Sequence, residues 1–332
     1  MHPIVRAPKH SELVNNSTLY VIGVLENSVR YHTRFRLFEE WVQRMKATPN
    51  VKLVLVELAF GDRHHECDPQ DPDITYIKVR GNSELFHKEN MINIALRALP
   101  PDYSYACICD TDIAFENEDW ALETIHQLQV YPVVQPFEQC ADMTARGSIL
   151  QVHQSFGKLH ATGVKMQRNA QEVYQHGHPG YALAFRKEVI EAVGGRFLDS
   201  CILGSGDHST ILAMVGRASD SFPQGVHKNY EKIILDWEKK IFKVVNGDIG
   251  YTEGSIKHFF HGPKQAFRSG GKEVGRAYIS RWKILLENQF DPEEDIYYNK
   301  DGIIELTGSK PKLTNDIRSY LRARREDSRE ED

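Results

Sequence analysis

Residues 105–116 read YACICDTDIAFE, and this stretch decides the expected fold. Five mostly apolar, β-prone residues run directly into Asp110, Thr111 and Asp112, so we expect a buried strand that ends at a pair of carboxylates. In open α/β sheets, ligands bind at the carboxyl ends of the strands. A tight turn there lets one carboxylate bind a metal ion while the other contacts a sugar hydroxyl. By itself, the triplet is equally consistent with a solvated turn at the end of a strand.

The composition is that of an ordinary globular protein. With 332 residues, of which 41% are hydrophobic, the chain has room for one large α/β domain or two small ones. The net charge of −5 comes from charges of both signs, which gives little support to a nucleic-acid or anionic-membrane surface. Five scattered cysteines lack paired CxxC units, so we expect no zinc site and a reducing cytoplasm. Neither a signal peptide nor a membrane span is expected, because no long apolar run occurs.

Strands and helices alternate from residue 18 to residue 116. Apolar, β-prone runs predict strands at 18–25, 51–60, 74–79 and 105–109. Apolar residues at helical spacing predict helices within 26–46 and over 86–100. This alternation predicts a mostly parallel sheet with right-handed crossovers, as in a Rossmann half. No GxGxxG or GxxxxGK[ST] motif follows the first strand, which disfavours dinucleotide dehydrogenases and P-loop ATPases.

The second half is expected to continue this pattern around a long loop. A helix is predicted over 119–129, and a strand follows within 131–140. The polar stretch 140–177 has no clear period, so it is either a substrate lid or an insertion without function. A strand from residue 180 and a helix from residue 186 then resume the order.

Asp207 follows a flexible turn made by Gly204, Ser205 and Gly206, and a helix to about residue 215 is expected after it. Two interpretations stay open. As a helix N-cap, Asp207 would stabilise the fold by ~1 kcal/mol. As a general base, it would use the space that the glycines leave for a bound sugar.

The stretch IKHFFHGPK (256–264) places His258 and His261 three residues apart at the end of an expected strand. If the strand breaks between them, both imidazoles can turn toward one cation, and Lys264 can neutralise a phosphate. For an arbitrary HxxH, one buried and one exposed histidine is the simpler interpretation. Combined with Asp112, the two imidazoles form an oxygen and nitrogen set that suits manganese more than calcium.

Four segments occur in an order that resembles the metal-dependent GT-A glycosyltransferases, most closely the inverting β1,4-galactosyltransferase-like group. They are FHKENMINIAL (86–96), DYSYACICDTDIAF (102–115), ILGSGDH (202–208) and HFFH (258–261). In that order, they resemble the group's F-N-R-x-x-x-L-N-x-G helix, its D-Y-x-Y strand ending in D-x-D, its G-W-G-G-E-D acceptor loop and its M-x-x-H motif. The resemblance runs from about residue 18 to about residue 264.

The resemblance implies an α/β GT-A fold, with a Rossmann-like nucleotide-binding half, a mixed central sheet and helices on both faces. We expect a polar arm over 1–17, a glycosyltransferase domain over 18–264 and a helical extension with a charged tail over 265–332. Within the domain, 18–116 would be the nucleotide-binding half and 117–264 the acceptor half. The last fifteen or so residues, almost wholly charged, are expected to form a solvated helix that frays.

The resemblance also implies roles for individual residues. Asp112 and His261 would bind Mn²⁺ or Mg²⁺, His258 would take the group's methionine position at the metal, and Asp110 would contact the ribose or donor sugar. Asp207 would accept the proton of the acceptor hydroxyl. The residues expected at the nucleotide are Glu57, Phe86, Lys88, Asn93 and Lys264.

The expected activity is manganese-dependent transfer of a hexose from a nucleotide sugar, expected to be UDP-linked, with inversion. The acceptor would be a hydroxyl of a glycan, a glycoconjugate or a hydroxymethylated base in DNA, although the acidic net charge counts against DNA. Ser205 stands where the group has a tryptophan, and one acid of that loop is missing, so the acceptor does not carry over. Two other classes stay open, a metal-dependent nucleotidyl- or phosphotransferase and a non-catalytic sugar-binding module.

Overall fold

The computed structural model describes residues 18–67, 69–163, 177–263, 266–269, 272–275 and 278–329, with the backbone alone for the described residues between 266 and 280. The expected N-terminal arm over 1–17, part of the expected loop (164–176) and Lys264 lie outside the described residues. In the part of the chain that is described, no helix is long and apolar enough to cross a membrane.

The centre of the molecule is a mixed sheet with the strand order β10-β6-β9-β4-β1-β2-β3. Its strands are β1 (Leu19–Glu26), β2 (Val51–Phe60), β3 (Thr75–Gly81), β4 (Tyr105–Cys109), β6 (Val133–Gln135), β9 (Ala182–Arg186) and β10 (Ile249–Tyr251). Neighbouring strands are parallel except that β9 runs antiparallel to β4 and β6. The strands predicted in the first half are therefore confirmed.

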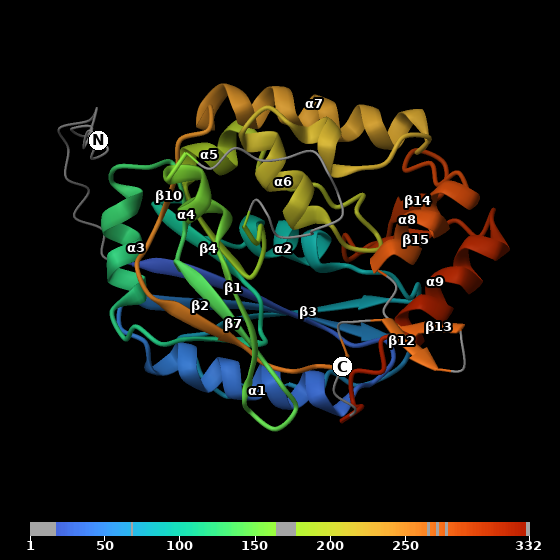
Figure 1. Cartoon of the computed structure of the whole chain (residues 1–332), viewed down its shortest axis with the longest axis horizontal. Coiled ribbons are helices and arrows are strands. Elements are labelled where there is room, and N and C mark those ends of the chain that lie inside the picture. The colour runs from blue at the N-terminus through green and yellow to red at the C-terminus, as the bar shows by residue number, and fades with distance from the viewer. Residues whose placement is uncertain are drawn as a thin grey trace.

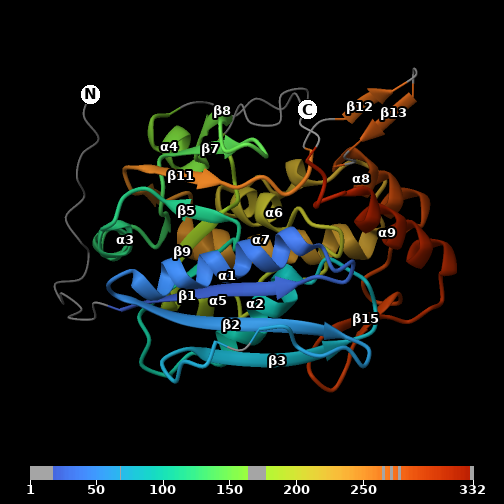
Figure 2. The same ribbon diagram turned by 90° about the horizontal axis from the view of Figure 1, so that it is seen from below.

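Helices cover both faces of this sheet (Figures 1 and 2). One face packs against α1 (His32–Ala47) and α3 (Trp120–Leu128), whose Trp41 and Trp120 are buried there. The other face packs against α2 (Lys88–Arg97), α5 (Lys187–Ala192), α6 (Gly206–Met214) and α7 (Lys228–Val245). This arrangement confirms the expected α/β fold with a mixed central sheet, because β-strands that are apolar on both sides need cover on both faces.

Gly23 in β1 shows how closely α1 packs onto the sheet. A Cβ at Gly23 would collide with the ring of Trp41, which is fully buried. The indole therefore lies against the backbone of β1, where only glycine leaves room for it. We expect removal of this ring to cost about 3–5 kcal/mol of folding stability.

A second, four-stranded sheet has the order β5-β11-β7-β8. Its strands are β5 (Ile113–Phe115), β7 (Gln139–Met143), β8 (Ile149–Gln154) and β11 (Ser255–His258). The strand predicted within 131–140 is confirmed in part. It contains β6, but it ends at Gln135, because Pro136 cannot donate to a ladder, and residues 139 and 140 belong to β7 of the other sheet. The stretch from residue 140 is also more regular than expected, since it contains β7, β8 and α4 (Phe156–Ala161).

The C-terminal part adds strands as well as helices. After the short 3₁₀ helix Ala218–Ser221 and α7, it contains α8 (Tyr278–Glu287), α9 (Pro311–Ala323) and two hairpins. The hairpins are β12 (Ala266–Ser269) with β13 (Lys272–Gly275), and β14 (Ile296–Tyr298) with β15 (Ile304–Leu306).

The described C-terminal residues are solvated only in part: residues 322, 323, 325, 327 and 329 are exposed, and others are not. In α9, Ile317, Tyr320 and Leu321 belong to the main apolar core. After the helix, Glu326 is only 1% exposed, because it lies against α1. Part of this charged segment therefore forms ion pairs within the molecule.

Candidate metal and donor site

Backbone pairing brings Asp112 to the two histidines. Asp112 lies in the turn between β4 and β5, and His258 is the last residue of β11. In the antiparallel pair of β5 and β11, Ile113 is opposite His258, and the Phe259 amide donates to the Asp112 carbonyl at 2.9 Å. Two segments that are far apart in the sequence therefore meet at the carboxyl end of β4.

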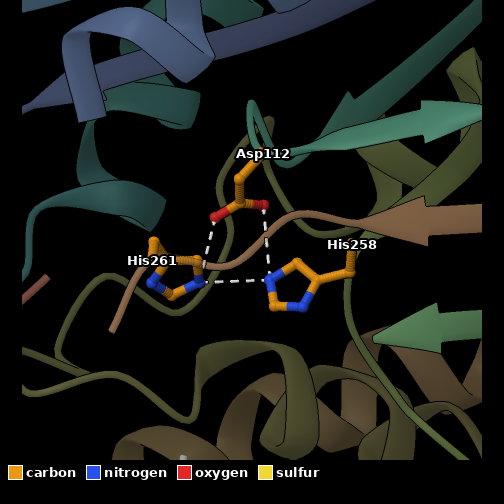
Figure 3. Close-up of side chains that lie close together, drawn as sticks. All are labelled: Asp112, His258 and His261. Atoms are coloured by element: carbon orange, nitrogen blue, oxygen red, sulfur yellow. Dashed lines mark hydrogen bonds and ion pairs between the residues drawn. The ribbon is translucent and has the colours of Figure 1, made fainter. Parts of the chain in front are cut away.

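The side chains of Asp112, His258 and His261 point toward one another (Figure 3). His258 Nε2 lies 3.7 Å from Asp112 Oδ1, and His261 Nε2 lies 3.3 Å from Asp112 Oδ2. The two Nε2 atoms are 3.1 Å apart. Both imidazoles are buried, whereas the carboxylate is partly exposed, so the cluster opens toward solvent on the Asp112 side.

The chemistry of this cluster fits a divalent cation. Asp112 Oδ1 is buried, and within the described residues it accepts no hydrogen bond. Burial alone would raise the pKa of Asp112, but the imidazoles of His258 and His261 hold that pKa well below its usual range. A carboxylate and two imidazole nitrogens that converge in this way form a ligand set suited to Mn²⁺ and similar transition-metal ions.

Asp142 in β7 orients one of the imidazoles, and the sequence analysis missed it. Its Oδ1 lies 2.7 Å from His258 Nδ1 and accepts a hydrogen bond from the Tyr181 hydroxyl at 3.1 Å, while Gln151 donates to Oδ2 at 2.6 Å. Asp142 is 1% exposed. A carboxylate at Nδ1 holds the proton there, which leaves the Nε2 lone pair for a metal ion. No motif includes Asp142, so the sequence offers no signal for this role.

The other aspartate of the triplet, Asp110, has a cation of the chain as its partner. Lys88, the first residue of α2, forms an ion pair with Asp110 Oδ1, and the Asp110 amide donates to the Tyr181 carbonyl at 2.7 Å. Burial alone would lower the pKa of Lys88, but Asp110, Asp207 and Glu89 together hold that pKa above its usual range. Asp110 and Lys88, both predicted at the donor, therefore lie together.

Asp207 and Glu89 lie near the ion pair of Lys88 and Asp110, and these four residues form a second cluster of charges. The Asp207 carboxylate packs against Gly180, where a Cβ would collide with Oδ2. The Glu89 carboxyl packs against Gly206 in the same way. Burial, assisted by the charge of Asp207 and opposed by that of Lys88, raises the pKa of Glu89 to about 8. Glu89 was missed because its position in α2 looks like an ordinary polar site on a helix.

The interpretation of Asp207 as an N-cap is wrong. Helix α6 begins at Gly206, so Ser205 precedes it, with a left-handed φ of 77°, and Asp207 lies in the first turn. Asp207 Oδ1 accepts a hydrogen bond from the neighbouring His208 amide at 2.8 Å. Its role as a general base stays a prediction.

Phe86 lines a small open pocket, with a volume of about 20 Å³, at the carboxyl end of β1. Glu26 lines the same cavity, and its Oε2 accepts a hydrogen bond from the His87 amide at 2.8 Å. The cavity is also lined by Arg34 from α1 and by residues that follow α9, none of which the sequence analysis singled out. The position of Phe86 is compatible with its predicted contact with a nucleotide.

Glu57 and Asn93 are held in other interactions. The Glu57 carboxylate accepts hydrogen bonds from the Glu66 and Cys67 amides, at 2.5 and 3.0 Å, and from the Tyr76 hydroxyl. The Asn93 side chain bonds to both backbone polar groups of Phe197 and to Asp199. The structure thus gives Glu57 and Asn93 roles in holding loops, and their predicted nucleotide contacts stay predictions.

No family model matches the sequence, and a search of curated proteins returns no match. Among solved structures, the chain is similar to a mannosyltransferase from Pyrobaculum calidifontis in complex with GDP-Man and Mn²⁺. The identity is 16% and the TM-score 0.42, over 91% of this chain and 69% of that chain. It is also similar to the catalytic domain of Drosophila beta1,4galactosyltransferase 7 in complex with xylobiose. There the identity is 9% and the TM-score 0.38, over 89% and 98%.

A third similar structure is 4-diphosphocytidyl-2C-methyl-D-erythritol synthase from Anaerococcus prevotii. The identity is 13% and the TM-score 0.34, over 73% of this chain and 88% of that chain. Similarities at these TM-scores are too distant to assign a function.

Proposed function

We propose that the chain is a manganese-dependent glycosyltransferase that moves a hexosyl group from a nucleoside diphosphate sugar to an acceptor hydroxyl. The observation that carries the proposal is the convergence of Asp112, His258 and His261 at the carboxyl end of β4. Open α/β sheets bind their ligands at this edge. A small open pocket lies at the carboxyl end of the neighbouring strand, β1.

Asp112, His258 and His261 would hold the metal ion, and Asp142 would keep His258 in the tautomer that leaves Nε2 free. When bound, a divalent cation supplies neutralisation of the charge that develops on the leaving diphosphate. Lys88 and Asp110 lie beside this centre, where they would contact the donor.

In the transfer step, a bond forms between the acceptor oxygen and the anomeric carbon of the sugar, while the bond from that carbon to the diphosphate oxygen breaks. The nucleoside diphosphate leaves with the bonding electron pair. The acceptor proton passes to the Asp207 carboxylate, which would act as general base. Glycine at position 180 keeps the space beside this carboxylate free of a side chain.

We further propose UDP as the nucleotide and inversion at the anomeric carbon, because the segments 202–208 and 258–261 resemble the inverting group. The acceptor hydroxyl would belong to a glycan or glycoconjugate. All five cysteines are free thiols, which supports the reducing cytoplasm as the location.

The proposal is tested by incubating the purified chain with a panel of nucleotide sugars, with and without Mn²⁺, and measuring release of the nucleoside diphosphate. We expect manganese-dependent release, faster with an acceptor glycan, and a product of inverted configuration by NMR. Binding of nucleotide sugars without release would instead indicate a sugar-binding module. Release of pyrophosphate from a nucleoside triphosphate and a sugar 1-phosphate would indicate a nucleotidyltransferase.

A further inference from the structure

Tyr181, the residue before β9, contacts both the turn that carries Asp110 and the side chains around His258. We propose that Tyr181 is a positioning residue, which holds the metal ligand His258 and the donor residue Asp110 in a fixed relation to each other. This role rests on the proposed function and adds to it a side chain on which the geometry of the metal site depends.

The backbone of Tyr181 has a conformation that bulky residues rarely adopt. Its φ is 73°, in the left-handed region, where a Cβ is crowded and glycine is the usual residue. Non-glycine residues persist in such conformations only when their surroundings hold them there, and they gather at functional sites. A tyrosine at this position is therefore accounted for by the contacts of its side chain.

Backbone pairing joins Tyr181 to the turn after β4. Cys109 is opposite Ala182 in the antiparallel pair of β4 and β9. The Asp110 amide continues this pairing by donating to the Tyr181 carbonyl at 2.7 Å. Tyr181 therefore holds the backbone at the start of the triplet that ends at Asp112.

The side chain of Tyr181 reaches the metal ligand His258 through Asp142. The Tyr181 hydroxyl donates to Asp142 Oδ1 at 3.1 Å, and the same oxygen lies 2.7 Å from His258 Nδ1. Tyr181 is 5% exposed and Asp142 is 1% exposed, so this hydrogen bond is shielded from water, where a bond to a charged acceptor is strong. The hydroxyl therefore holds the carboxylate in the position from which it orients the imidazole.

The ring of Tyr181 packs against two imidazoles. It stacks on His178, with ring centroids 3.9 Å apart and an interplanar angle of 11°, and its centroid lies 4.7 Å from that of His258. His178 accepts a hydrogen bond at Nδ1 from the Gly180 amide and another at its carbonyl from the Gln135 side chain, both at 3.1 Å. These contacts restrict the rotation of the tyrosine ring, which fixes the direction of its hydroxyl.

The residue before Tyr181 packs on the second cluster of charges. A Cβ at Gly180 would collide with Asp207 Oδ2, so the backbone there lies directly against the proposed general base. Consecutive residues thus contact Asp207 and the surroundings of His258. A displacement of Tyr181 would therefore disturb both groups of side chains.

The test removes the hydroxyl alone, in Tyr181→Phe. Tyr230→Phe is the matched control, because Tyr230 is also fully buried and its hydroxyl lies 3.6 Å from Cys201 Sγ in the main apolar core. Binding of Mn²⁺ is measured by EPR titration, and folding by the melting temperature. We expect Tyr181→Phe to weaken Mn²⁺ binding about threefold to tenfold, in line with the loss of one hydrogen bond, and Tyr230→Phe to leave it unchanged.

Transfer kinetics and a double variant separate positioning from a role in the chemical step. In Tyr181→Phe, the Mn²⁺ concentration that gives half-maximal transfer should rise, whereas kcat at saturating Mn²⁺ should stay near the wild-type value. In a chain that already carries Asp142→Ala, the hydroxyl has lost this acceptor, so adding Tyr181→Phe should weaken Mn²⁺ binding no further.

Wild-type Mn²⁺ affinity in Tyr181→Phe, or an equal loss of affinity in Tyr230→Phe, would overturn the inference and leave the proposed function standing. Losses that add in full in the double variant would overturn it as well, because the hydroxyl would then not act through Asp142. A wild-type chain that binds no Mn²⁺ would contradict the proposed function itself.

Discussion

Asp110 and Asp112 are two residues apart in one turn, yet their surroundings differ. Asp110 is paired with the ammonium group of Lys88, a cation that belongs to the chain. Asp112 faces two imidazoles, and its Oδ1 accepts no hydrogen bond within the described residues. Burial raises the pKa of Asp110, and the charge of Asp112 adds to this effect while that of Lys88 opposes it. The pKa of Asp112, in contrast, is held below its usual range by the two imidazoles.

This difference shows which of the two aspartates has the surroundings of a metal ligand. Asp110 already has the ammonium group of Lys88 as its partner. Asp112 and the two imidazoles instead offer one carboxylate oxygen and two ring nitrogens that lie close enough together to hold a divalent cation. Asp112 therefore has surroundings that could hold a metal ion, whereas Asp110 is paired with a lysine. Variants of both groups of side chains test this difference.

The largest effect is expected from His261→Ala, which removes one metal ligand. We expect Mn²⁺ binding to be lost and transfer to fall below detection, because several kcal/mol of transition-state stabilisation depend on the ion. Binding is measured by the EPR signal of free Mn²⁺, and transfer by release of nucleoside diphosphate. His126→Ala, a change at an exposed site on α3, serves as the control and should keep both Mn²⁺ binding and transfer. Normal Mn²⁺ binding by the His261 variant would remove this histidine from the ligand set.

Asp207→Asn tests the cluster of charges around Lys88, to which Asp207 belongs. The change keeps the shape of the side chain but removes the proton acceptor, so kcat should fall about a hundredfold to ten-thousandfold. Binding of the nucleotide and of Mn²⁺ should be retained, since Asp207 is not among the proposed metal ligands. An unchanged kcat would show that another group, or none, takes the acceptor proton.

Asp142→Asn tests the support of His258. Loss of the carboxylate weakens the hold on the Nδ1 proton, and we expect about tenfold to a hundredfold weaker Mn²⁺ binding, measured by EPR titration. Asp119→Asn, at an exposed site before α3, provides the matched control. If both variants bound Mn²⁺ with equal affinity, His258 would keep its tautomer without Asp142.

The smallest effect concerns the pH dependence of stability. The pKa of Glu89 is raised to about 8 in the folded chain from 4.5, so between these values the folded chain binds more protons than the unfolded chain. Folding stability contributed by Glu89 is therefore present at acidic pH and is lost as the pH rises through about 8. In Glu89→Gln, urea unfolding should show a smaller loss of stability between about pH 5 and pH 8. If the free energy of unfolding changed with pH in the same way in both proteins, the assigned environment of Glu89 would be contradicted.

Much of the first half of the fold could be predicted from the sequence, because its strands are continuous apolar runs. The stretch at Asp110 and Asp112 and the pair of His258 and His261 were also recognisable, since each is a short local motif. Helix α7 carried a readable signal, with Tyr230, Ile234, Trp237, Ile241 and Val245 buried at helical spacing, although the sequence analysis gave it no assignment.

The parts that could not be predicted depend on contacts between distant segments. Asp142 is an isolated acid in a short strand, and only the pairing of β7 with β11 places it beside His258. Glu326 and Arg324 belong to a charged run that is typical of a disordered tail. The burial of Glu326 depends on its ion pair with Arg34 of α1 and on the hydrogen bonds of Asp327 to the start of α1, which no local pattern reveals.

The most direct test of the central claim is anomalous diffraction at the manganese edge from crystals of the chain soaked with MnCl₂ and UDP. We expect one strong peak at a Mn²⁺ ion bound by Asp112 and by Nε2 of both His258 and His261, with the diphosphate as a further ligand. A peak elsewhere, or UDP bound without an ion at these three side chains, would contradict it.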